Sequence, residues 1–161
     1  MRWAIFLVLA MILGVFFWMW GGSDIQKEIP FYYKKIMGKT IEIEINNTKI
    51  TAEIARSSGE KAKGLSGREY LEVNRGMIFL YAEPLIPNFW MKEMEIPLDF
   101  IWLMDDKIVE ITPNVLPDKG PDYKLYSPKV SVNRVLEVNS GFCQKNGLEI
   151  GQSVKYGKDL K

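Results

Sequence analysis

The chain has 161 residues, of which 47% are hydrophobic and 25% charged, as is typical of a globular protein. Its 21 basic and 20 acidic side chains leave almost no net charge, which argues against a nucleic-acid partner. The absence of histidine excludes Ser-His-Asp and Cys-His catalysis and removes the commonest zinc ligand. The single cysteine, Cys143, cannot form an internal disulfide, and we expect a packed, unreactive thiol. No motif predicts a metal site or a cofactor.

Residues 3–20 read WAIFLVLAMILGVFFWMW and contain no polar side chain. As a helix they would span about 27 Å, close to the thickness of a hydrocarbon core. Trp3 lies at one end and Trp18 and Trp20 at the other, where membrane interfaces favour tryptophan. The run therefore predicts a transmembrane anchor. A cleaved signal peptide is the alternative, because Arg2 gives the run a charged start.

The organisation that follows is an anchor at residues 1–22, a linker at residues 23–38 and one domain at residues 39–161. A signal-like layout places the domain outside the cell membrane, although lysines in the linker favour the cytoplasm under the positive-inside rule. We predict a single-pass protein of the cell membrane with an extracytoplasmic domain. Its contact with the lipid bilayer would be made by residues 3–20.

Residues 40–55, TIEIEINNTKITAEIA, predict a β-hairpin with a two-residue turn at Asn46-Asn47, because asparagine tolerates positive φ. This register sets Glu44 opposite Lys49, a pair of opposite charges. It also sends one set of apolar side chains to a single face: Ile41, Ile43, Ile45, Ile50, Ala52 and Ile54. A slip of one residue would destroy both patterns, so the register is strongly specified.

Ser57 and Glu60 have the spacing of a capping box, which predicts a helix of about two turns. Gly64 is suited to end that helix. The apolar run at residues 76–82 then predicts a buried strand. A second hairpin is expected around Asp105-Asp106, and its two apolar faces favour a central position in the sheet.

Residues 113–128 are rich in proline and predict a long loop, which could serve as a lid. The last strands are expected at residues 131–138 and 152–156, with a short turn or helix at residues 141–147. Hairpins are frequent and strands do not alternate with helices. The fold class that follows is mainly β, a compact antiparallel β-sandwich or barrel with one or two short helices, preceded by the transmembrane helix.

The segment at residues 88–98, NFWMKEMEIPL, crowds aromatic and sulfur-containing side chains beside charges. An extended backbone would place Trp90, Lys92 and Met94 on one face, and Phe89, Met91 and Glu93 on the other. The segment is then either a core strand or the wall of a binding site. As a wall, it would offer Trp90 as a flat platform for a sugar ring or another weakly polar ligand, with Lys92 as a charge beside it.

Two acidic residues, Asp99 and Glu137, lie within otherwise apolar strands, where an ionised carboxylate is costly without partners. Asp99 either caps backbone N–H groups near Pro97 or belongs to a site. Arg68 could pair with either acid. If the two carboxyl groups met, they could act as the general acid and base of a hydrolase.

Several short motifs occur in a fixed order across residues 53–154: Gly64-Leu65 with Arg68, Gly76-Met77 with Phe79, Phe89-Trp90-Met91-Lys92, Pro97-Leu98-Asp99, Leu136-Glu137 with Gly141, and Gly147 with Gly151. In this order they resemble an uncharacterised, often membrane-associated family catalogued as domain of unknown function 192. The resemblance implies a compact, mostly β domain of sandwich type, exported or anchored in bacteria and archaea, and it implies no activity. The chain departs from the family pattern at Ser66, where methionine is usual, and at Glu93-Met94, where Asn-Thr is common.

Together these observations predict a membrane-anchored domain that binds a small molecule or glycan. Its contacts would be Trp90 as a platform, Lys92 and Arg68 as polar groups, and Asp99 with Glu137 as orienting groups. One alternative is a protein–protein interaction module at the membrane surface, which requires a flat, exposed apolar patch. The other is a hydrolase that uses Asp99 and Glu137 as its carboxylate pair.

Overall fold

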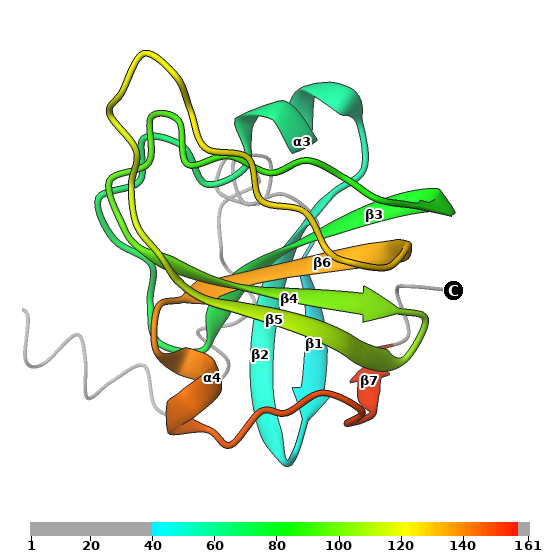
Figure 1. The fold of residues 1–161 in the computed structure, drawn as a ribbon. Coiled ribbons are helices and arrows are strands. Elements are labelled where there is room, and N and C mark those ends of the chain that lie inside the picture. Colours follow the sequence, from blue (N-terminus) through cyan, green and yellow to red (C-terminus); the bar gives the residue numbers. More distant parts are fainter. Residues whose placement is uncertain (1–39, 158–161) are drawn as a thin grey trace, which may run out of the picture. The chain divides into compact units, whose positions relative to one another are not determined.

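The computed structural model describes residues 40–157, so the predictions for the anchor and the linker lie outside the described residues. Within this range seven strands form one curled sheet in the order β5-β4-β6-β3-β2-β1-β7 (Figure 1). The strands are β1 (Thr40–Ile45), β2 (Thr48–Ala55), β3 (Arg75–Leu85), β4 (Leu98–Met104), β5 (Lys107–Val115), β6 (Val132–Asn139) and β7 (Val154–Tyr156). The helices are α3 (Ser58–Lys63) and α4 (Phe142–Lys145). None of the helices in residues 40–157 has the length and apolar character to span a membrane.

The first hairpin, β1–β2, has the predicted register. Glu44 lies opposite Lys49, and all six apolar side chains of the predicted face are buried. Both turn residues have positive φ, 47° at Asn46 and 61° at Asn47, as the two-residue turn requires. The carboxylate of Glu44 forms its ion pair with Lys155 of β7, at 2.8 Å, because β7 pairs with the other edge of β1.

The prediction of a fully antiparallel sheet is wrong at one pair of strands, because β2 and β3 run parallel. A parallel pair needs a long crossover, and the segment between these strands contains α3. The capping box that predicted this helix is present: Ser57 Oγ accepts from the N–H of Glu60, whose carboxylate accepts from the N–H of Ser57. The helix ends at Gly64, where φ is 49°.

Of the two predicted architectures, a sandwich or a barrel, the sandwich is wrong, since residues 40–157 form one curled sheet that is apolar on both sides and is closer to the barrel. Side chains that alternate along β4 belong to two different core clusters. The α4 face contains Ile78, Ile101, Leu103, Leu136 and Val138, packed with Phe142 and Cys143 of α4. The α3 face contains Met77, Phe79, Phe100, Trp102 and Val135, covered by Leu65, Phe89 and Met91. Helix α4 therefore covers one face of the sheet, and loops cover the other. In a sandwich, a second sheet would cover one of these faces.

The second hairpin, β4–β5, turns at the predicted place, but only β4 is central. Strand β5 stands at the end of the strand order. Its edge is covered, because the N–H of Ile108 donates to the carbonyl of Gln152 at 3.1 Å and the N–H of Gly151 donates to the carbonyl of Ile108 at 2.8 Å. These bonds bring the chain before β7 against β5, which protects an otherwise open edge.

The proline-rich loop begins later than predicted, because β5 includes Pro113 and continues to Val115. The loop then lies along the segment that contains Trp90. Phe89 and Tyr126 exchange backbone hydrogen bonds of 2.9 and 2.8 Å, and the N–H of Asp118 donates to the carbonyl of Met91 at 3.3 Å. The loop therefore braces this segment against the α3 face.

Candidate functional site

A hollow of about 360 Å³ opens on the α3 face of the sheet. Its walls come from α3 and the residues that follow it, from β3, and from residues 88–94. Seven of its side chains are apolar or aromatic: Ala62, Leu65, Phe79, Tyr81, Phe89, Trp90 and Met94. Its charged side chains are Lys61, Lys63 and Glu137. The hollow thus combines an aromatic wall with a few polar groups, as small-molecule sites commonly do.

Glu137 is the deepest polar group of the hollow, with 5% of its surface exposed. Its Oε2 atom has no hydrogen-bond partner. Burial raises the pKa of Glu137 from 4.5 to about 8, and the positive charge of Arg68 acts in the opposite direction. At neutral pH the carboxyl group is therefore mostly protonated, and one of its oxygens is left without a hydrogen-bond partner.

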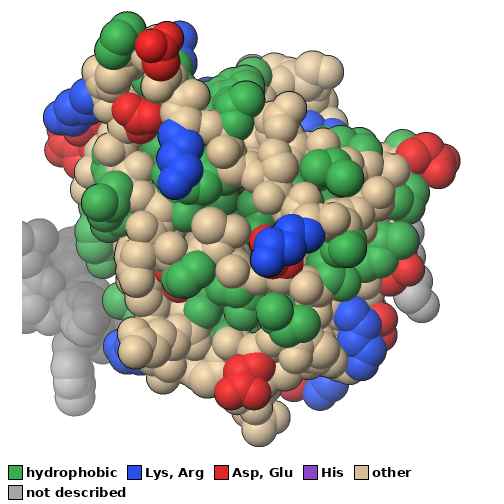
Figure 2. All heavy atoms as spheres, in the orientation of Figure 1, with side chains coloured by type: hydrophobic (Ala, Val, Ile, Leu, Met, Phe, Trp, Pro, Cys, Tyr) green, Lys and Arg blue, Asp and Glu red, His purple; other side chains and the backbone are tan. Residues whose placement is uncertain are grey.

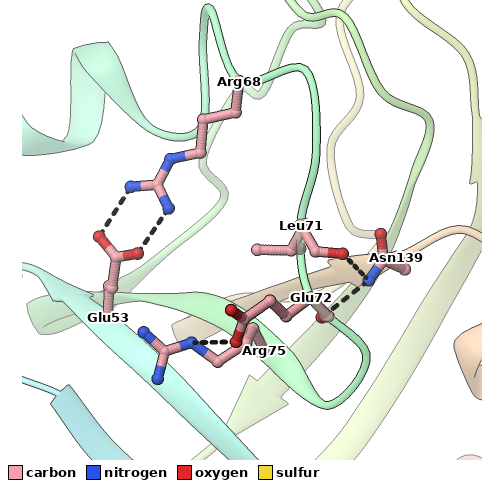
Figure 3. A network of polar contacts seen from close by, with 6 residues as sticks. All are labelled: Glu53, Arg68, Leu71, Glu72, Arg75 and Asn139. Carbon is pink, nitrogen blue, oxygen red and sulfur yellow. Dashed lines mark hydrogen bonds and ion pairs between the residues drawn. The ribbon is translucent and has the colours of Figure 1, made fainter. Parts of the chain in front are cut away.

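Arg68 lies beside Glu137 but is paired with Glu53. Its Nη1 and Nη2 atoms donate to the two carboxylate oxygens of Glu53 at 2.5 and 2.7 Å (Figure 3). The strand registers place Glu53, Met77 and Glu137 in one row across β2, β3 and β6. The hydrogen bonds from Arg68 lower the pKa of Glu53, so the fork of Arg68 is occupied by an ionised partner.

The residues of the NFWM segment differ in burial, so the segment is not a core strand throughout. Phe89 is buried and packs edge-on against Phe79, with ring centroids 4.9 Å apart. Trp90 points the other way, is 43% exposed and lines the hollow. The predicted alternation fails at Met94, which is buried, because Glu93 has a φ of 56° and turns the chain. Trp90 therefore shares its exposed side with Lys92 but not with Met94.

The two lysines that line the hollow do not include Lys92, the one expected from the sequence. Lys92 is exposed and lies outside the lining, with Nζ 3.8 Å from Glu93 and 5.7 Å from the ring centroid of Tyr123. Lys61 of α3 lines the hollow instead, with Nζ 4.1 Å from the ring centroid of Tyr81. Partial burial lowers the pKa of Lys61. The sequence gives no signal for Lys61, because a lysine on a short helix is usually solvated.

Asp99 has a structural role on the opposite face of the sheet. It is fully buried, and its carboxylate accepts three backbone N–H groups, from Asn114 at 2.9 Å, Gly141 at 3.1 Å and Cys143 at 3.0 Å. The capping role weighed from the sequence is therefore present, with one donor from β5 and two at the start of α4 instead of donors near Pro97. Cys143 is a buried free thiol whose pKa is raised by burial, as expected of an unreactive side chain.

The two carboxyl groups do not meet. In the register of β4 and β6, Asp99 lies opposite Val138, and Glu137 lies opposite Phe100. Neighbouring positions of a strand point to opposite faces, so the sheet separates Asp99 from Glu137. This placement removes the acid–base pair that the hydrolase hypothesis requires. The described residues also contain no group of three or more cysteine, aspartate or glutamate side chains that could hold a metal ion.

Exposed apolar side chains do not form one flat patch on the face shown in Figure 2, where they lie in separate groups among charged and polar atoms. The most exposed of them come from three separate segments of the chain: Tyr70 with Val73, Leu116, and Ile150. Trp90 lies at a concavity. The flat apolar patch that the interaction-module alternative requires is therefore not seen on this face.

Comparisons with known proteins place the fold. A family model, DUF192, described as "Uncharacterized ACR", matches residues 41–156. A crystal structure from Sinorhizobium meliloti 1021, described provisionally as a transcription regulator, has a TM-score of 0.68 at 23% identity and covers 74% of this chain and 95% of that one. That likeness shows the fold alone. A protein of unknown function from Novosphingobium aromaticivorans DSM 12444 has a TM-score of 0.63 at 32% identity, over 72% and 83%. No curated protein matches the chain.

Proposed function

Because this chain belongs to the DUF192 family, which is described as uncharacterised, we propose a function from its own site: the domain binds a small polar molecule in the hollow beside Glu137. The observation that carries the proposal is that Glu137 lines the hollow with a buried carboxyl group whose Oε2 has no hydrogen-bond partner. An unpaired buried polar atom costs about 1–3 kcal/mol, and native proteins keep few of them. A ligand that hydrogen-bonds to Glu137 would recover this free energy.

The aromatic wall supports the same proposal. Trp90 leaves 43% of its surface exposed at the rim, while Phe89 beside it is buried in the core. A large ring held on a rigid base offers apolar contact area at a small loss of conformational entropy. In the proposed site Trp90 covers the ligand and Glu137 orients it. Arg68 sets the electrostatic environment of Glu137.

Two residues predicted as contacts from the sequence are left outside this proposal. Asp99 is used by the backbone of α4, and Lys92 lies outside the hollow. The membrane anchor and the extracytoplasmic location remain part of the proposal on the strength of residues 3–20 alone, whose apolar run is long enough for a bilayer.

The proposal is tested by isothermal titration calorimetry of the full chain in detergent against sugars, nucleosides, organic acids and amino acids. We expect saturable binding of one class. Trp90→Ala should weaken that affinity about tenfold or more, because the ring loses its contact area with the ligand. Tyr70→Ala is the matched control, since Tyr70 is a 70% exposed aromatic residue outside the hollow. The proposal fails if no class binds, or if both variants bind as the unchanged chain does.

A further inference from the structure

The charges of the hollow differ in sign and in depth. Glu137 is its acidic side chain and is almost fully buried. Its two basic side chains, Lys61 and Lys63, belong to α3; Lys63 is exposed and Lys61 is half-buried. Among residues 40–157, no carboxylate oxygen lies within 4.0 Å of either lysine nitrogen. The hollow therefore offers an acid at its base and two cations without a close carboxylate partner nearer its mouth.

None of the charged groups around Glu137 forms an ion pair with its carboxyl group. Arg68, from the loop after α3, directs both of its terminal nitrogens to Glu53 of β2. Tyr81, from β3, has a pKa raised to about 12 by burial and by Glu137, so it stays neutral. The lysines of α3 complete the surroundings of the hollow. A cation delivered by a ligand would be the group that pairs with Glu137 directly.

On this basis, which rests on the proposed function, we propose that the ligand is a zwitterion of the amino-acid type: its ammonium group binds Glu137, and its carboxylate binds Lys61 and Lys63. A neutral sugar would leave the lysines without a partner. A simple anion would gain nothing from Glu137, and a simple cation would have to pass two lysines. Phe79, Phe89 and Met94 would take an apolar side chain of the ligand.

Proton balance follows from this pairing. Before binding, the carboxyl group of Glu137 carries a proton at neutral pH. When the ammonium group arrives, that proton leaves to the solvent, and a carboxylate–ammonium pair remains. Binding at pH 7 should therefore release close to one proton for each ligand bound. A ligand without an ammonium group would leave the proton in place.

The test compares L-phenylalanine with two probes that each lack one of its charged groups: N-acetyl-L-phenylalanine lacks the ammonium group, and phenethylamine lacks the carboxylate. Calorimetry of the full chain in detergent, in buffers of different ionisation enthalpy, gives both the affinity and the number of protons released. We expect phenylalanine to bind about tenfold or more tightly than either of the others, because each of them lacks one ion pair. We expect proton release with phenylalanine and none with the acetylated probe.

Two variants test which side chains bind the ammonium group and the carboxylate of the ligand. Glu137→Gln should abolish the proton release and weaken phenylalanine about tenfold or more. Its control is Glu110→Gln, since Glu110 is a half-buried acid outside the hollow. Lys61→Met, a change on a short surface helix that the fold tolerates more readily, should lower the affinity for phenylalanine toward that for phenethylamine, with Lys63 keeping part of the carboxylate contact. This second variant keeps the test valid if Glu137→Gln fails to fold.

Each result decides between the two proposals. If the acetylated probe or a neutral sugar binds as tightly as phenylalanine, and Trp90→Ala weakens it, the hollow is a binding site but the zwitterion assignment is overturned. If phenylalanine binds with no proton released, the pairing with Glu137 is overturned. If none of the amino acids, sugars, nucleosides and organic acids binds, both proposals fall.

Discussion

At the scale of single residues, Glu137 makes the stability of the domain depend on pH. Its pKa in the folded chain is about 8, raised by burial from 4.5. Between these two values the unfolded chain has lost a proton that the folded chain keeps, so the free energy of unfolding falls as pH rises. Below pH 4.5 both states are protonated and the effect vanishes; above pH 8 the penalty is complete.

Replacement of Glu137 by glutamine should remove this dependence. We expect Glu137→Gln to gain stability relative to the unchanged chain as pH rises from 5 to 8, by up to about 1.4 kcal/mol per pH unit. Urea denaturation followed by circular dichroism at several pH values measures the difference. Parallel stability curves for the two chains would contradict a raised pKa. Glu110→Gln serves as the control, because it changes an acid outside the hollow.

Replacement of Asp99 should lower the stability of the domain, because its carboxylate already accepts hydrogen bonds. Asp99→Ala would leave three backbone N–H groups of Asn114, Gly141 and Cys143 without their acceptor. We expect a loss of about 3 kcal/mol or more in the free energy of unfolding. Chemical denaturation measures it, with Asp122→Ala, an exposed position, as the control. A loss below about 1 kcal/mol would show that water replaces the carboxylate.

The residue scale also shows how far the sequence could predict the site. Trp90 and Glu137 both line the hollow, and both could be singled out from the sequence, because an aromatic cluster and an acid inside an apolar strand are unusual features. The separation of Asp99 from Glu137 could not be predicted, because it depends on which residues of β4 and β6 lie opposite each other. Sequence periodicity gives the face of each residue within its own strand, but not the register between strands distant in sequence.

At the scale of secondary-structure elements, β3 and β6 approach so closely at Gly76 that no side chain fits. A Cβ atom there would overlap the carbonyl oxygen of Glu137. Gly76→Ala should therefore push the two strands apart, at a cost of about 2 kcal/mol or more. It should also displace Glu137 and disturb the hollow. Thermal denaturation measures the first effect and ligand titration the second.

Gly59 of α3 is the matched control for Gly76. A Cβ atom there would meet nothing within 4 Å. Since alanine favours a helix more than glycine does, Gly59→Ala should stabilise the domain by about 0.5–1 kcal/mol. Equal destabilisation by both substitutions would contradict the close contact at Gly76.

Elements were predictable where their partners are near in sequence. The turn at Asn46-Asn47 fixes the register of β1 and β2 locally, and that register is confirmed. The parallel pairing of β2 with β3 was missed, although the capping box at Ser57 marked the helix of the crossover. One short helix between two strands carries little information about strand direction when hairpins dominate the rest of the chain.

At the scale of the whole molecule, we propose that residues 3–20 anchor the protein in the membrane. Residues 3–20 should hold the protein in membranes that are washed with alkaline carbonate. Arginine at both Leu9 and Ile12 should release it, because each charge at the centre of a spanning helix costs about 2.5–3.5 kcal/mol. Ile36→Arg, in the linker, should leave the protein in the membrane fraction. Release of the unchanged chain by carbonate would contradict the anchor.

The sandwich expectation failed at this same scale. Both faces of β4 are apolar, which signals that each face needs a cover, but composition cannot tell a second sheet from a helix and loops. Here the loop that follows β5 pairs with Phe89 and Met91 over the α3 face. Such loops show no regular periodicity in sequence, and so the architecture was predicted only as far as its class.

The pairing of β7 with β1 joins the two ends of the described domain. During synthesis β1 leaves the ribosome first, and β7 leaves it last. The outer edge of β1 therefore lacks its partner until residues 154–156 have emerged, whichever hairpin forms first. Until then the growing chain also lacks the bonds that cover β5. Residues 154–156, although few, therefore determine when the domain no longer exposes an unpaired strand edge to other chains.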